Sequence, residues 1–180
     1  KVSVATRLKI FQVANLSIQK QKMEMNKPLS DIRVLSIESY GAGPWATLQL
    51  VDLGAEVIKI ETPSVGDISR HIPPGVKDGD SLFYQSLNRG KKSLTLNLKT
   101  PEGKEALFRL LPNIDVLFAN PKGTMPEKIG ITYECLKKYN KRLVCCFLSG
   151  YGRTGPRAAQ PGYDYLVQSL SGMAWLGGEP

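Results

Sequence analysis

The sequence predicts an α/β fold built on a parallel sheet. A strand, a glycine turn, a helix and a second strand follow one another within about thirty residues, between Arg33 and Glu61, which is one βαβ unit. Further short apolar runs alternate with helix patterns as far as residue 170, giving about five strands. The length of 180 residues and the 42% of hydrophobic residues suffice for one sizeable core. Ligands of such sheets bind where strands end, so we expect the functional residues in the loops that follow the strands.

The first unit is defined by local signals. Arg33 to Ile37 is a short apolar run typical of a buried strand. Gly41-Ala42-Gly43 interrupts it, and Pro44 has the fixed φ that suits the first position of a helix. Apolar residues then recur at helical spacing up to Gly54, which favours a left-handed helix end. Residues 57–60 are the second strand.

The later elements continue this alternation. Residues 62–80 are rich in Gly, Pro, Ser and Asp and predict a long loop, of a length that is often functional. Thr100, Pro101 and Glu102 mark a helix start, with a capping threonine, a proline in the first turn and an acid near the positive end of the dipole. The other expected strands are 93–98, 114–118 and 142–148, and the expected helices are 81–88, 101–111, 132–139 and 163–170.

Charge is distributed unevenly along the chain. The formal net charge is +8, and residues 1–27 hold six lysines and arginines against one glutamate, so that +5 of it lies there. Because the excess lies mostly outside the predicted core, we do not expect a nucleic-acid partner. We interpret residues 1–27 as a basic transit-type leader or as upstream sequence left by cloning or gene prediction, and in either case not as part of the fold. The domain is residues 28–180.

The cysteines and the apolar runs set further expectations. Three cysteines without CxxC spacing and a single histidine predict neither a metal site nor a disulfide framework, which favours a reducing compartment, the cytoplasm or the mitochondrial matrix. No apolar run approaches the roughly 20 residues that span a bilayer, so no membrane partner is expected. His71 has no second histidine and no paired Ser or Cys signature, so a catalytic triad is not expected.

A glycine pattern offers one candidate site. Gly41, Gly43 and Ala46, with Glu61 at the end of the next strand, have the spacing of a dinucleotide-binding fingerprint. Pro44 removes a backbone N–H from the turn that would bind a pyrophosphate, which weakens such a site. The alternatives are a nicotinamide or flavin cofactor site and a tight strand-to-helix turn without a ligand.

Basic residues after the strands and one acidic residue, Asp164, offer two more candidate sites. Cations at the carboxyl ends of parallel strands suit a ligand with several phosphate groups, although surface charge alone also explains each of them. Asp164 begins the last helix; we interpret it first as a cap or dipole partner and second as a catalytic candidate. The cations are Lys59, Arg70, Arg89, Lys91, Lys92, Lys122, Lys128, Arg153 and Arg157.

The chain resembles the N-terminal part of the family III CoA-transferases of the CaiB/BaiF type, whose superfamily also contains α-methylacyl-CoA racemase. The resemblance covers only the first part of a family member, so we expect this domain to be truncated. The matching segments run in order, and several are long. They are residues 28–35, 42–44, 52–61, 66–67, 88–99, 101–103, 127–130, 150–156 and 162–164.

The resemblance implies a Rossmann-like parallel sheet with helices on both faces that holds coenzyme A, in a homodimer whose two chains are interlocked. Thr62, Lys122 and Lys128 stand where many members have arginine; an ammonium group neutralises phosphate but lacks the bidentate fork. Gly41 stands where oxalate-specific members have glutamine, so oxalate is not the expected acid. The implied CoA-binding residues are Gly41, Ala42, Thr62, Leu96, Asn97, Leu98, Lys99, Asn120, Lys122 and Lys128.

The implied reaction moves CoA from an acyl-CoA donor to a carboxylic acid by covalent carboxylate catalysis. An aspartate attacks the thioester to give a mixed anhydride, the CoA thiolate returns to give an enzyme thioester, and the acceptor acid takes the CoA. In the family this aspartate follows the Gly-Tyr-Asp motif by about thirty residues, which here is beyond Pro180, so the 180-residue chain alone is expected to be inactive.

Two alternatives to CoA transfer remain. A racemase would have a histidine where this chain has Tyr163, and a tyrosine with a pKa of about 10 is a poor base for an α-proton, which favours the transferase. The alternative of another class is a truncated, inactive fragment that only binds CoA or a partner chain.

Overall fold

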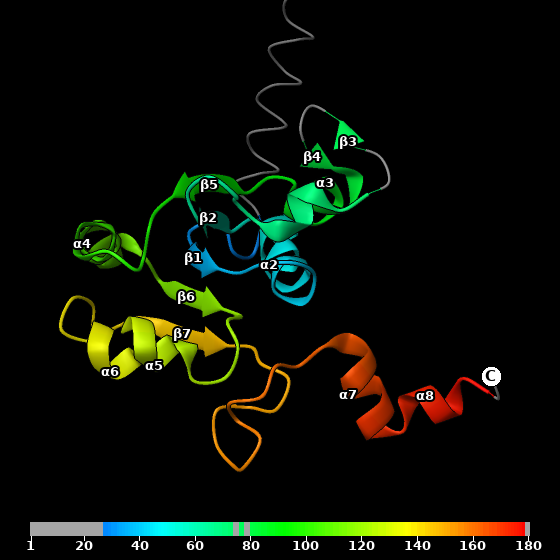
Figure 1. Ribbon diagram of the computed structural model, residues 1–180. Helices are drawn as coiled ribbons and strands as arrows, with labels where there is room; N and C mark the ends of the chain where they lie inside the picture. The colour runs from blue at the N-terminus through cyan, green and yellow to red at the C-terminus, as the bar shows by residue number, and fades with distance from the viewer. Residues whose placement is uncertain (1–26, 74–75, 78–79, 179–180) are drawn as a thin grey trace, which may run out of the picture.

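A five-stranded sheet forms the centre of the computed structural model, which describes residues 27–73, 76–77 and 80–178 (Figure 1). The strand order is β5-β2-β1-β6-β7, and every neighbouring pair is parallel. This confirms the predicted α/β fold. Residues 1–26, most of the predicted leader, lie outside the described residues. The strands are β1 (Arg33–Ile37), β2 (Glu56–Glu61), β5 (Lys92–Thr95), β6 (Val116–Ala119) and β7 (Val144–Phe147).

Helices cover both faces of the sheet (Figure 1). Helix α2 packs on one face, and α4 and α6 pack on the other. No helix in the described part of the chain is long and apolar enough to cross a membrane. The helices are α2 (Ala42–Asp52), α3 (Leu82–Asn88), α4 (Pro101–Leu110), α5 (Met125–Ile129), α6 (Tyr133–Leu136), α7 (Asp164–Ser171) and α8 (Met173–Leu176), with short 3-10 turns η1 (Ile68–His71) and η2 (Leu111–Asn113).

The alternation of side chains along the strands builds the two faces. Val34 of β1 lies beside Val57 of β2, and both pack in the cluster under α2. Leu35 and Leu117 lie on the opposite face, in the larger cluster that also contains Leu107 of α4. All five are essentially inaccessible to solvent. Burial of this kind contributes about 25 cal/mol per Å² of apolar surface and supplies most of the stability of such a sheet.

The end of α2 and the start of α4 agree with the sequence prediction, whereas α2 begins two residues earlier than predicted. Gly54 has φ of 106° directly after α2, the left-handed stop that was expected. The hydroxyl of Thr100 accepts a hydrogen bond from the Gly103 amide, so the predicted cap of α4 is confirmed. Helix α2 begins at Ala42, two residues before Pro44. Proline is tolerated there because amides in the first turn have no partner within the helix.

Other boundaries differ from the prediction. Strand β5 ends at Thr95 because its partner β2 ends at Glu61, opposite it. The expected helix 132–139 is shorter, Tyr133–Leu136. Residues 62–80 are not one plain loop, because they contain η1 and β3 (Val76–Lys77), which pairs with β4 (Asp80–Ser81). Helix α5 was not predicted, since five residues are too few to establish a helical period.

Helices α7 and α8 extend away from the sheet (Figure 1). Helix α7 confirms the expected helix at 163–170, whereas α8 was not predicted. Neither contains a buried residue, and Trp175, 83% exposed, is among the most exposed large hydrophobic residues of the described chain.

Candidate functional site

Four adjacent parallel strands end at one edge of the sheet, and the predicted binding residues lie in the segments that follow them. Gly41 and Ala42 follow β1, and Thr62 follows β2. Residues 96–99 follow β5, and residues 120–128 lead from β6 into α5. Because β5, β2, β1 and β6 are neighbours in this order, the topology brings all of these segments to the same edge.

The predicted residues differ in what they offer at this edge. Leu96 and Leu98 are half-buried and pack against the hydrophobic core, so their polar contribution to a ligand comes from their backbones. Asn97 accepts a hydrogen bond from the Lys99 amide, 3.1 Å away, and so shapes the turn before α4. The polar side chains that face solvent are Thr62, Asn97, Lys99, Lys122 and Lys128.

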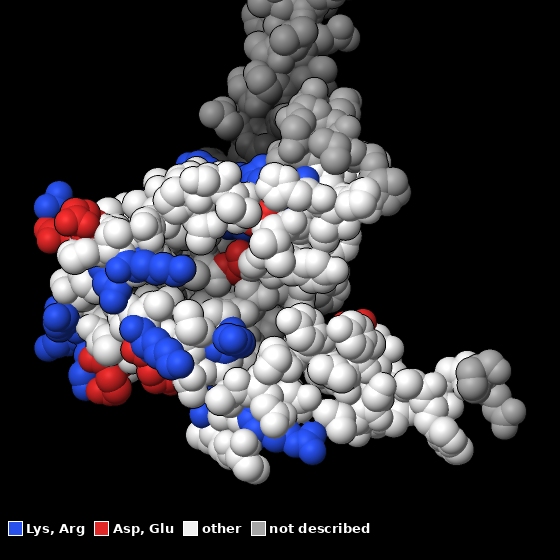
Figure 2. Space-filling view, viewed as in Figure 1, with Lys and Arg blue, Asp and Glu red and all other residues white. Residues whose placement is uncertain are grey.

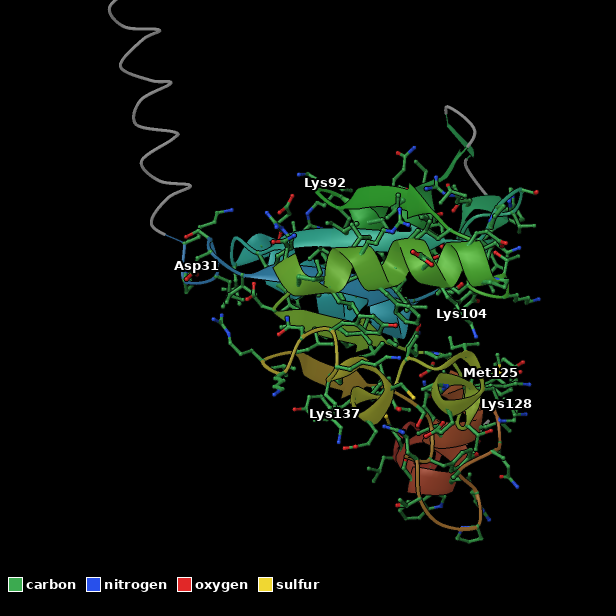
Figure 3. The ribbon with its side chains drawn as sticks, turned by 90° about the vertical axis from the view of Figure 1, so that its left-hand side faces the viewer. Asp31, Lys92, Lys104, Met125, Lys128 and Lys137 are labelled. Atoms are coloured by element: carbon green, nitrogen blue, oxygen red, sulfur yellow. The ribbon has the colours of Figure 1, made fainter. Side chains whose placement is uncertain are left out.

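Lysines make this edge basic. Lys99, Lys122 and Lys128 have no salt-bridge partner among the described residues. Figure 2 shows basic side chains gathered over the region of α4 and α5. Lys104, near the start of α4, lies on the same side as Lys128, whereas Lys92 and Lys137 lie toward the opposite edge (Figure 3). Lys104 was missed from the sequence, although its position one turn after the Thr100 cap is a usable signal.

Two of the proposed cations point inward and cannot bind a ligand. The ammonium group of Lys59 is buried and donates to Asp67 and to the Asn88 side-chain oxygen, 2.8 Å away. Lys91 donates to Glu38 at 2.8 Å, with both side chains almost inaccessible. The prediction that they bind phosphate is therefore wrong, because their charges are neutralised inside the protein.

Most of the other proposed cations also have acidic partners. Arg70 bonds Glu61 through two nitrogens, at 2.7 and 2.6 Å. Arg89 pairs with Asp52, Lys92 with Glu56 and Arg153 with Glu127, all at the surface, where such pairs contribute about 0–1 kcal/mol. Arg157 lies over the ring of Tyr151.

The turn between β1 and α2 is held from two sides. Asn120 accepts from the Ser39 amide at 2.9 Å and donates to the Ser39 carbonyl at 3.1 Å. Asp67 accepts from the Ser39 hydroxyl at 3.1 Å and from the Tyr40 amide at 3.0 Å. The Asn120 carboxamide is thus used within the protein. Lys59 belongs to the same network, because it donates to Asp67. A lysine inside an otherwise apolar strand is the one feature of the sequence that could have indicated a buried acidic partner.

The glycine pattern serves packing within the protein. A Cβ atom at Gly43 would lie 2.6 Å from the side chain of Asn120, so a larger residue would displace that side chain. Glu61, the acid of the dinucleotide fingerprint, accepts from Arg70, Tyr84 and Ser93 and is 5% exposed. It therefore has no free oxygen at the surface for a ribose, which argues against the nicotinamide or flavin alternative.

The contacts of Asp164 and His71 among the described residues are local ones. Asp164 is exposed at the start of α7 and accepts from Gln168 at 2.7 Å, which agrees with a dipole partner. It is not the cap, because Tyr163 occupies that position. His71 is exposed and contacts the Val65 carbonyl. Within the described chain, no group of three His, Cys, Asp or Glu side chains is placed to hold a metal ion.

The buried carboxylates are held in their charged forms. Burial raises the pKa of Glu61, but hydrogen bonds from Arg70, Ser93 and the Asp67 amide outweigh it and lower this pKa from 4.5 to about 2. Burial likewise opposes the hydrogen bond from Lys59 at Asp67, and the pKa of that carboxyl falls below its usual 3.8. Burial lowers the pKa of Lys91 despite the opposing charge of Glu38.

The low pKa of Glu61 predicts acid sensitivity. A carboxyl group whose pKa is depressed by folding contributes stability above its unfolded pKa and loses it as the pH falls through the folded pKa, here from 4.5 down to about 2. The full contribution of Glu61 is on the order of 3 kcal/mol. We expect Glu61→Gln to be less stable at pH 7 and to lose less stability over this range, as measured by urea unfolding at several pH values.

Glu105→Gln is the matched control for this measurement, because Glu105 is an exposed carboxylate paired with Arg109. Its unfolding free energy should follow that of the wild type at every pH. A Glu61→Gln curve parallel to the wild-type curve between pH 4.5 and 2 would contradict the assignment.

Comparison with known proteins shows similarity to one family, the CoA-transferases of family III. The sequence profile of CoA-transferase family III matches residues 29–180. The succinate–glutarate CoA-transferase of Agrobacterium fabrum is 45% identical over 159 residues, covering 85% of this chain and 40% of that protein. The succinyl-CoA:mesaconate CoA-transferase of Haloarcula marismortui is 42% identical over 84% of this chain and 40% of that protein.

A solved structure supports the same relationship. The crystal structure of a CAIB/BAIF family protein from Brucella suis aligns with a TM-score of 0.79 and 40% identity, over 86% of this chain and 42% of that one. The chain therefore spans about 40% of the length of the curated relatives described above.

Proposed function

Because the chain belongs to CoA-transferase family III, we propose that the full-length protein moves CoA from an acyl-CoA donor to a free carboxylic acid. The observation that carries this proposal is the match of residues 29–180 to the family profile. The basic edge of the sheet supports it, because CoA carries a diphosphate and a further phosphate on its ribose. Phosphates bind well to unpaired ammonium groups and to backbone amides at helix starts.

We place the phosphorylated part of CoA at the lysines of this edge. Lys99, Lys122 and Lys128 are exposed and carry charges that no described carboxylate neutralises. Thr62 and the backbones of residues 96–98 border the same region. Gly41 and Ala42, at the start of α2, would lie nearer the acyl end. Asn120 acts by holding the β1–α2 turn, since its carboxamide is engaged with Ser39.

The chemistry we propose is nucleophilic catalysis by an aspartate outside residues 1–180. Its carboxylate attacks the thioester carbonyl and expels CoA thiolate, forming a mixed anhydride. The thiolate then attacks the aspartyl carbonyl, releasing the donor acid and leaving an enzyme thioester. Attack by the acceptor carboxylate and return of the thiolate complete the exchange and regenerate the aspartate. The names of the relatives described above favour a dicarboxylic acid as acceptor.

Assembly and location belong to the same proposal. We propose a homodimer in the cytoplasm or the mitochondrial matrix, as expected from the sequence. The racemase alternative is not favoured: Tyr163 stands where that branch has a histidine, and the relatives described above are named as CoA-transferases.

An acyl-exchange assay on the full-length protein tests this function. With succinyl-CoA as donor, we expect glutarate or mesaconate to yield a new acyl-CoA, detected by chromatography, and oxalate to be a poor acceptor. Without an acceptor, intact-mass measurement should detect a covalent CoA adduct. Titration with NADH serves as the ligand control and should give no binding. Exchange of the α-proton without CoA transfer, or no binding of CoA, would overturn the proposal.

A further inference from the structure

We propose that Asp67 is a positioning residue that holds the turn between β1 and α2 in the shape that binds CoA. The inference rests on the proposed function, because Gly41 and Ala42 of this turn are expected to contact CoA. Asp67 itself is 2% exposed and lies beneath the turn, so it would act through the turn and not by touching the ligand.

The Asp67 carboxylate joins the segment that follows β1 to the segment that follows β2. Its Oδ1 atom accepts from the Ser39 hydroxyl at 3.1 Å and the Tyr40 amide at 3.0 Å, both after β1. The same oxygen accepts from the amide and hydroxyl of Ser69, at 2.9 and 2.8 Å, after β2. Its Oδ2 atom accepts from Lys59. The carboxylate therefore has a partner on each side and cannot rotate without losing several hydrogen bonds.

The backbone at the held position is strained. Tyr40 has φ of 73°, a left-handed conformation that a tyrosine adopts only where its surroundings impose it. Tyr40 is 54% exposed, and its ring pairs with that of Phe83 at 5.7 Å between centroids, a contact that orients the side chain and does not act on the backbone. The hydrogen bond from its amide to Asp67 acts on the backbone directly.

The strained residue, Tyr40, directly precedes the expected binding residues Gly41 and Ala42. Asn120 holds Ser39 from the other side of the turn, and Gly41 follows Tyr40 as the cap of α2. If Tyr40 relaxed to negative φ, the backbone direction of Gly41 and the first amides of α2 would change. Asp67, which is buried and charged, and Asn120, which is neutral and half-buried, therefore hold Ser39 and Tyr40 from two sides, and a positioning role requires such support.

The test compares Asp67→Asn with wild type in the full-length protein. We expect CoA to bind about tenfold more weakly by calorimetry, because the acceptor of the turn becomes neutral and the amide nitrogen in place of Oδ2 cannot accept from Lys59. Hydrogen exchange of the segment 39–43 should become faster without CoA. Leu136→Ala is the control for lost stability, since Leu136 is buried in α6 and does not touch the turn. It should leave CoA affinity within about twofold and exchange of 39–43 unchanged.

A double-mutant cycle with Tyr40→Gly separates positioning from mere stability. Glycine adopts positive φ freely, so Asp67→Asn should weaken CoA binding by less than about threefold in the Tyr40→Gly background. Equal effects in both backgrounds would overturn the inference. If Asp67→Asn does not fold, Ser39→Ala removes one of the same hydrogen bonds and should weaken CoA binding by about threefold.

The exchange measurement does not depend on CoA. A wild-type protein that fails to bind CoA overturns the proposed function, whereas unchanged exchange of 39–43 in Asp67→Asn, or in Ser39→Ala if Asp67→Asn does not fold, overturns the positioning role.

Discussion

Replacing Lys59 with methionine is expected to lower the free energy of unfolding by about 3–5 kcal/mol, because it leaves the buried carboxylate of Asp67 without its ionic partner. Both side chains of this pair are at most 1% exposed, so water cannot replace the lost interaction. Methionine has a similar length and shape, which limits the cavity contribution. Urea unfolding at pH 7 measures the change.

Lys92→Met is the matched control, since Lys92 is on the adjacent strand and pairs with Glu56 with 68% of its side chain exposed. An exposed pair contributes about 0–1 kcal/mol, so this variant should remain close to wild type. Equal losses in the two variants would show that the burial of the Lys59 pair has no energetic consequence.

The double substitution Lys122→Glu and Lys128→Glu is expected to weaken CoA binding by about 100-fold or more, because two charge-assisted contacts to phosphate become repulsions. Both residues follow β6 and are exposed, so the fold should be retained. Calorimetric titration of the full-length protein with CoA, together with a thermal unfolding curve, checks both statements.

The control is the pair Lys137→Glu and Lys141→Glu, which changes the net charge by the same amount. Lys137 lies toward the opposite edge of the sheet (Figure 3), so this variant should bind CoA within about threefold of wild type. The double variant Lys122→Arg and Lys128→Arg should bind CoA at least as tightly as wild type, because the guanidinium fork suits phosphate. A similar loss in both glutamate variants would assign the effect to overall charge and not to a site at this edge.

The sheet could be predicted from the sequence because its signals are local. The strand Arg33–Ile37 has the predicted bounds, and Gly54 and Thr100 end and begin helices as expected. Each signal depends on residues within a few positions of one another, such as a cap and the amide three residues on. Parallel order then brings the loops after β5, β2, β1 and β6 to one edge, as expected, and the proposed binding site at this edge stays a prediction.

Which charges remain available to a ligand was decided only by the tertiary structure. In the sequence, Lys91 resembles Lys122: each is a lysine in a glycine-containing turn next to a strand. In the fold, Lys91 is buried against Glu38, 53 positions away, whereas Lys122 has no such partner within the described part of the chain. The tertiary structure also explains Gly43, whose small size is required by the side chain of Asn120, in the segment after β6. Such pairings depend on burial and on distant partners, which no local pattern encodes. The sequence by itself determined the sheet and the edge at which the segments after its strands gather, and the packing determined which side chains that edge presents.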